Sequence, residues 1–139
     1  MIKRLIASVV VVLVLVTAVV AGVVREGTFS AVSDGINITI RWISDDEGGV
    51  ARYELERKAG INGVFVLISP VPMQGNNAVY EYIDDSAFLS ESSSETVYQY
   101  QLKIVHSNGA PPEIYGPITV RHEVSGVRKT WGSIKAMFR

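Results

Sequence analysis

The segment Ile36-Asn37-Ile38-Thr39-Ile40-Arg41-Trp42 indicates a β-strand, because apolar and polar side chains alternate along it. A period of two puts every second side chain on the same face of a β-strand, whereas a helical face needs a period near 3.6. We therefore expect the three isoleucines and Trp42 to face a core and the polar residues between them to face water.

The same period of two continues along the chain, in segments separated by turn residues. Two further segments have apolar residues at every second position: Ala51, Tyr53, Leu55 and Tyr98, Tyr100, Leu102, Ile104. One further expected strand begins at Phe29, and three more cover 64–68, 79–83 and 115–120. Pro70 and Pro72 close the one at 64–68. The sequence predicts an all-β fold, a seven-stranded antiparallel sandwich over residues 27–121.

Four motifs in this order resemble the strands of a fibronectin type III domain, which has an immunoglobulin-like fold. Trp42 followed by an acidic, glycine-containing loop and Tyr53-x-Leu55-x-Arg57 is similar to that family's B and C strands. Tyr80-x-Tyr82-x-Asp84 and Thr96-x-Tyr98-x-Tyr100-x-Leu102 are similar to its E and F strands. The resemblance implies structural roles for Trp42, Tyr53, Leu55, Tyr98 and Leu102, with Tyr98 as the tyrosine-corner residue.

The chain departs from the family pattern at two places. Trp42 is not followed by the usual proline, and the connection over 86–95 is longer and richer in serine than the family's usual turn. Members of this family in bacterial surface and secreted proteins imply protein binding or adhesion as the function.

The family topology would bring the loops at 45–49, 70–77 and 107–113 to one end of the sandwich, where binding residues are often found. Candidate binding residues in these loops are Asp45, Asp46, Glu47 and Asn108. The three acids also supply the hard oxygen ligands that Ca²⁺ prefers, but adjacent positions lack the alternate spacing of a wrapping calcium loop. We therefore expect no metal site.

Catalytic residues and cofactors are not expected either. His106, Ser107 and Asp45 together supply a base, a nucleophile and an acid, but the chain has no nucleophile elbow, no phosphate-binding glycine loop and no cysteine. A polysaccharide-binding strip of Tyr80, Tyr82 and Tyr115 is an alternative function, on condition that all three rings face outward.

The first 24 residues predict export. Lys3 and Arg4 precede an uncharged, apolar run from Leu5 to Val24, and this charge pattern keeps the N-terminus in the cytoplasm and sends the remainder across the membrane. Two interpretations stay open. A signal peptide would be cut after Ala21 or Ala18, leaving the protein periplasmic or extracellular, while an uncut segment would anchor it in the cytoplasmic membrane with the domain outside.

Residues 122–139 form a basic, amphipathic tail. Apolar residues recur at helical spacing beside basic ones, and the candidate docking residues are Val127, Arg128, Lys129, Trp131, Ile134, Lys135, Phe138 and Arg139. Its partner is a membrane surface, another protein, or the acidic face of its own or a neighbouring sandwich.

Charge is distributed unevenly along the chain. Residues 26–120 contain five basic and thirteen acidic side chains, a net charge of −8, and residues 121–139 contain five basic and one acidic, a net charge of +4. An acidic body argues against nucleic-acid binding, which needs a positive face. Opposite charges on body and tail make self-assembly into a structural subunit the second functional hypothesis.

Overall fold

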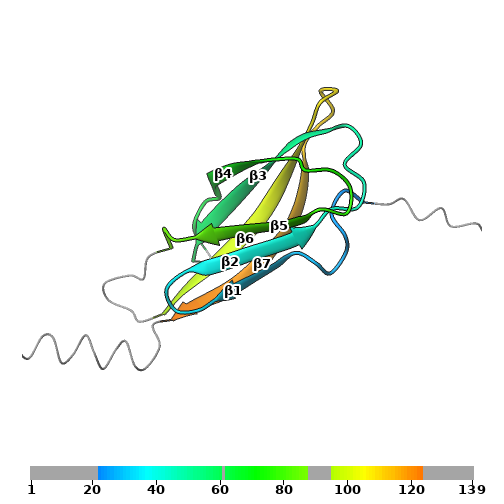
Figure 1. The fold of residues 1–139 in the computed structure, drawn as a ribbon. Helices are drawn as coiled ribbons and strands as arrows, with labels where there is room; N and C mark the ends of the chain where they lie inside the picture. The colour runs from blue at the N-terminus through cyan, green and yellow to red at the C-terminus, as the bar shows by residue number, and fades with distance from the viewer. Residues whose placement is uncertain (1–21, 61, 88–94, 124–139) are drawn as a thin grey trace, which may run out of the picture.

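The computed structural model describes residues 22–60, 62–87 and 95–123. These residues form seven strands: β1 (Ser30–Ser33), β2 (Ile38–Ile43), β3 (Val50–Ala59), β4 (Val66–Pro72), β5 (Val79–Asp84), β6 (Glu95–His106) and β7 (Glu113–Glu123). All strand pairs are antiparallel, in a three-stranded sheet of order β1-β2-β5 and a four-stranded sheet of order β4-β3-β6-β7. Figure 1 shows the two sheets as layers of a sandwich, so the predicted all-β, seven-stranded sandwich is confirmed.

The core lies between the sheets and consists of the inward side chains that the alternation predicted. Ile38, Ile40 and Trp42 of β2 are buried, and so are Tyr53 and Leu55 of β3 and the row Tyr98, Tyr100, Leu102, Ile104 of β6. Trp42 stacks on Tyr80 with ring centroids 4.8 Å apart, and Tyr53 meets both rings edge-on. Aromatic side chains from both sheets thus fill the centre, which favours a single packing of the two layers.

Two expected inward residues lie at the surface instead. Ile36 is exposed because residues 34–37 form a turn, in which Asp34 Oδ1 accepts hydrogen bonds from the amides of Ile36 and Asn37. Ala51 is exposed because a bulge between Val50 and Arg52 shifts the register of β3, and Val50 takes the buried position.

Several predicted strand ends were also wrong. The strand expected at 64–68 is β4, which begins at Val66 and extends to Pro72, so Pro70 lies inside it and only Pro72 ends it. Pro70 and Pro72 pair with Glu54 and Arg52 of β3. An edge strand tolerates proline because one side of it has no neighbouring strand to receive an N–H. At the other end of the chain β7 continues to Glu123, and His122, which the sequence placed in the tail, is buried in the sandwich.

The N-terminal boundary is likewise earlier than predicted. Val24, assigned to the export segment, is 3% exposed and forms a β-bridge with Ser44. Val23 accepts a hydrogen bond at its carbonyl from the Asp45 amide, at 2.8 Å, and the Arg25 amide donates to the Ile43 carbonyl at the same distance. The sandwich therefore includes residues 22–26. No helix among residues 22–60, 62–87 and 95–123 meets the length and hydropathy required to cross a bilayer.

A buried carboxylate joins the sheets at the end of β5. Asp84 Oδ2 accepts hydrogen bonds from Tyr100 Oη of β6, at 2.7 Å, and from Arg57 Nη1 of β3, at 2.6 Å, while Ser86 Oγ donates to Oδ1. Burial raises the pKa of Asp84, but the hydrogen bonds from Tyr100, Arg57 and Ser86 outweigh it and hold the pKa below its ordinary value of 3.8. Asp84 is thus ionised in the folded protein at neutral pH.

We expect Asp84→Asn to lower the free energy of unfolding by about 3 kcal/mol at pH 7, because Arg57 and Tyr100 lose their charged acceptor. Since the folded pKa is depressed, the stabilisation is present above pH 3.8 and is lost as the pH falls through the lower folded value. Urea denaturation across this pH range should show the two proteins converging at acid pH. Asp85→Asn, at an exposed neighbour, is the control and should change little. An Asp84→Asn protein as stable as the parent at pH 7 would contradict this account.

Candidate interaction surface at the loop end of the sandwich

The connections β2–β3, β4–β5 and β6–β7 meet at one end of the sandwich, as the sequence predicted for the loops at 45–49, 70–77 and 107–113. The Glu47 amide donates to Asn76 Oδ1 at 2.8 Å, which joins the first two connections. The Ser107 amide donates to the Gly49 carbonyl at 2.8 Å, which joins the third. We call this region the loop end; the N-terminal segment 22–28 also belongs to it.

Glu47 holds the loop end to the core. Its side chain is buried, its Oε1 accepts hydrogen bonds from the hydroxyls of Tyr53 and Tyr80, and its Oε2 accepts one from the Gly75 amide at 2.7 Å. Burial, together with the Glu47 carboxylate, raises the pKa of Tyr80 to about 12 and raises that of Tyr53 as well. Both hydroxyls therefore remain protonated donors at neutral pH, and they replace the water that the carboxylate loses on burial.

The candidate loop residues have different environments. Glu47 is interior, so its expected role as an exposed binding residue was wrong. Asp45 is partly exposed and forms an ion pair with Arg25. Asp46 and Asn108 are exposed, and each accepts a hydrogen bond from a backbone amide two residues further on, that of Gly48 and that of Ala110. Only Asp46 and Asn108 of the four are fully presented to a partner.

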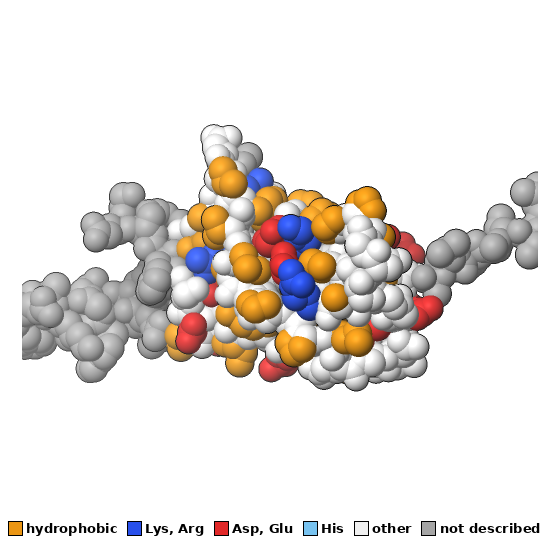
Figure 2. Space-filling view, turned by 90° about the horizontal axis from the view of Figure 1, so that it is seen from above, with side chains coloured by type: hydrophobic (Ala, Val, Ile, Leu, Met, Phe, Trp, Pro, Cys, Tyr) orange, Lys and Arg blue, Asp and Glu red, His pale blue; other side chains and the backbone are white. Residues whose placement is uncertain are grey.

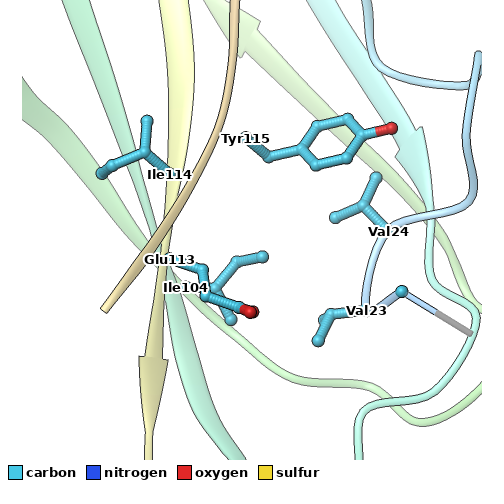
Figure 3. A pocket seen from close by; sticks show the side chains of 7 residues that line it. Val23, Val24, Ile104, Glu113, Ile114 and Tyr115 are labelled. Atoms are coloured by element: carbon cyan, nitrogen blue, oxygen red, sulfur yellow. The ribbon is translucent and has the colours of Figure 1, made fainter. Parts of the chain in front are cut away.

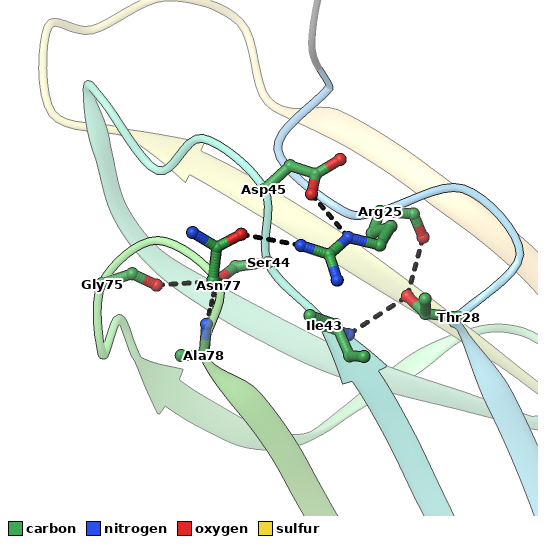
Figure 4. A network of polar contacts seen from close by, with 8 residues as sticks. All are labelled: Arg25, Thr28, Ile43, Ser44, Asp45, Gly75, Asn77 and Ala78. Atoms are coloured by element: carbon green, nitrogen blue, oxygen red, sulfur yellow. Dashed lines mark hydrogen bonds and ion pairs between the residues drawn. The ribbon is translucent and has the colours of Figure 1, made fainter.

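A polar network fastens the N-terminal segment to the loop end (Figure 4). Arg25 Nε lies 2.8 Å from Asp45 Oδ1, and Arg25 Nη2 donates to Asn77 Oδ1 at 2.7 Å. Thr28 Oγ1 donates to the Arg25 carbonyl and accepts from the Ile43 amide. Ser44 Oγ similarly joins the Gly75 carbonyl and the Ala78 amide. Asn77 has a φ of 58°, a left-handed conformation that asparagine tolerates.

An apolar groove of about 370 Å³ opens beside this network (Figure 3). Its walls come from the N-terminal segment on one side and from β6 and β7 on the other: Gly22, Val23, Val24, Ile104, Glu113, Ile114 and Tyr115. Glu113 supplies a carboxylate at the rim, where its Oε2 lies 3.4 Å from His106 Nε2. This groove could not be predicted from the sequence, because Val23 and Val24 lie at the end of the predicted export segment.

The three residues weighed as a catalytic set have separate partners. His106 lies against Glu113, Ser107 Oγ donates to the Gly49 carbonyl, and Asp45 pairs with Arg25. Within the described part of the chain, no three histidine, aspartate or glutamate side chains gather in a way that could hold a metal ion.

The tyrosine strip proposed for polysaccharides does not exist as such. Tyr80 is buried in the core, and Tyr82 and Tyr115 are partly buried and pack against it. Tyr80 and Tyr82 are two positions apart on β5, so both point inward.

The tail residues expected to dock, Val127 to Arg139, and the export segment up to residue 21 lie outside the described residues. Comparison of the chain with protein-family models, curated proteins and solved structures found no match. The geometry itself defines the class: an all-β protein of two antiparallel sheets with a hydrogen-bonded loop end.

Replacing Glu47 by Gln should lower the free energy of unfolding by about 2 kcal/mol, because the amide cannot serve both tyrosine hydroxyls and the Gly75 amide as acceptor. Asp46→Asn is the matched control, since it removes the neighbouring exposed charge, and should stay within about 0.5 kcal/mol of the parent. Urea midpoints of the three proteins provide the comparison. Equal midpoints for Glu47→Gln and Asp46→Asn would show that the buried carboxylate does not stabilise the loop end.

Proposed function

We propose that this protein is an exported, non-enzymatic module of the fibronectin type III class that binds another protein through its loop end. The observation that carries the proposal is an accessible apolar groove at an end whose loops are hydrogen-bonded to the core. A rigid frame limits the conformational entropy lost on binding, which favours recognition. The division of the strands into β1-β2-β5 and β4-β3-β6-β7 supports the class of sandwich.

The chemistry of the groove indicates the kind of surface that fits it. Val23, Val24 and Ile104 offer aliphatic contact, and Glu113, whose side chain is well exposed, offers one negative charge at the rim. A partner with an apolar side chain beside a basic one satisfies both features. Asp46 and Asn108, exposed on the neighbouring loops, provide further polar contacts of the kind found at the rim of protein interfaces.

The described residues also bear on export. Because Val23 and Val24 are part of the sandwich, the apolar run left for a membrane is residues 5–21, which is shorter than the roughly 20 residues that span a bilayer core. This supports a cleaved signal peptide, with the cut between Ala21 and Gly22.

The intact mass of the protein recovered from fractionated native cells tests this proposal. We expect the mass of residues 22–139 in a soluble fraction, since a cut further along would remove the hydrogen bonds of Gly22 and Val23 to the Asp46 and Asp45 amides. The full-length mass in the membrane fraction would instead show an uncut anchor.

Glu113→Lys should weaken partner binding more than tenfold, because the new lysine at the rim would face the partner's basic side chain, and like charges placed together across an interface cost more than the roughly 1.4 kcal/mol of a tenfold change. Glu123→Lys is the control: it makes the same charge change at an exposed position of β7, but at the other end of the sandwich. The measurement is the amount of each native envelope protein retained by the immobilised parent and by the two variants.

Loss with Glu113→Lys and retention with Glu123→Lys would support the loop end as the binding surface. Equal retention by both variants, or no protein retained by the parent, would overturn the proposed function.

A further inference from the structure

The outer face of the three-stranded sheet is an apolar surface without a covering layer among the described residues. Strand register places Val32, Thr39 and Ile83 side by side across the sheet, and Ile43 beside Val79. Val32 is 64% exposed and Val79 66% exposed. The charged side chains of this face are Arg41 and Glu81, which pair with each other at 2.6 Å. We call it the β1-β2-β5 face.

The outer face of the four-stranded sheet also has exposed apolar side chains, Leu67 and Ile114 among them, but it mixes them with more charged ones. Arg52, Glu54 and Lys103 form ion pairs on the outside of β3 and β6, and Gln101 hydrogen-bonds to Glu56. Figure 2, which looks down on the molecule, likewise shows a central strip of acidic and basic side chains with apolar ones spread around it. Water solvates such a mixed surface well, so the β1-β2-β5 face is the one that gains more from being covered.

The described chain stops close to this face. His122 Nδ1 lies 2.7 Å from Ser33 Oγ, so the last residues of β7 lie beside the end of β1. Val32 precedes Ser33 in β1 and pairs with Thr39 of β2, and Thr39 in turn pairs with Ile83 of β5. Residues 124–139 therefore continue from the end of the sandwich where the apolar face begins.

The apolar side of a helix formed by residues 124–139 would be about as long as the apolar part of the β1-β2-β5 face, and its basic residues would lie near acidic ones. Val127, Trp131, Ile134 and Phe138 fall on one side of a helix and extend over about 16 Å at 1.5 Å per residue. Ile83 and Val79 are about 13 Å apart along β5 at 3.3 Å per residue. Arg128 and Lys129 fall near the start of the tail, and Asp34 and Asp85 are exposed at the end of the sandwich from which it continues.

We propose that residues 124–139 fold back as an amphipathic helix onto the β1-β2-β5 face of their own sandwich, covering Val32, Ile83 and Val79. A short covalent connection gives the tail a high effective concentration at this face, which a separate partner lacks. The tail then forms a third layer and leaves the loop end free. This inference does not depend on the function proposed for the loop end.

A nitroxide on the tail tests the contact. The chain has no cysteine, so Ser133→Cys gives one labelling site in the protein as cells produce it. We expect the nitroxide to reduce the amide NMR signals of Val32 and Ile83 to less than half of their intensity in the reduced, diamagnetic sample. The amides of Val66 and Leu67, on β4 of the other sheet, should keep theirs.

Ile83→Asp should restore the lost signals, because the helix would have to bury a carboxylate against the sheet. Leu67→Asp is the matched control, since both side chains are 52% exposed on edge strands, and should leave the broadening unchanged. Three results would overturn the proposal: no broadening at Val32 and Ile83, equal effects of the two variants, or broadening that persists when label and isotope are on separate, mixed chains. The third would identify a second copy as the occupant.

A lipid surface is the remaining alternative. If Val32 and Ile83 keep their signals in solution and the labelled tail is immobilised only by anionic vesicles, the tail binds membranes and the proposal is wrong.

Discussion

The loop end depends on the burial of one carboxylate. Glu47 leaves water only because the hydroxyls of Tyr53 and Tyr80 and the Gly75 amide donate to it. These donors come from β3, from β5 and from the β4–β5 connection, so a single side chain fixes both sheets and two loops in one arrangement. The groove between the N-terminal segment and β7 lies beside this fixed frame, and Gly22 and Val23 of its wall accept hydrogen bonds from the amides of Asp46 and Asp45 in the β2–β3 connection.

Asp84 is a second buried carboxylate that joins the two sheets, at the opposite end of the core. It binds Tyr100 and Arg57 of the four-stranded sheet from its place on β5 of the three-stranded one. Between the two carboxylates, Trp42 and Tyr80 stack at the centre. A buried carboxylate whose hydrogen bonds join the two sheets therefore lies at each end of the core. The two described chain ends also lie far apart, Gly22 at the loop end and Glu123 at the other (Figure 1).

Alternation in the sequence predicted the strands and most of the core, because a period of two reports which face each side chain occupies. It could not report pairing between strands. The bulge that exchanges Ala51 for Val50, the position of Pro70 inside β4 and the burial of Val24 all depend on neighbours distant in sequence. Asp45, Asp46 and Glu47 look equivalent in the sequence, and only the tyrosines and the glycine amide brought in by other segments make Glu47 interior.

Amide hydrogen exchange tests whether the buried Glu47 makes the loop end part of the core. The Gly75 amide, which donates to Glu47, and the Ala110 amide, which donates to the exposed Asn108, are both in connections outside the strands. We predict that the Gly75 amide exchanges as slowly as the amides of β2, and that the Ala110 amide exchanges far faster. Equally fast exchange at both amides would contradict the account, because the loop end would then open independently of the core.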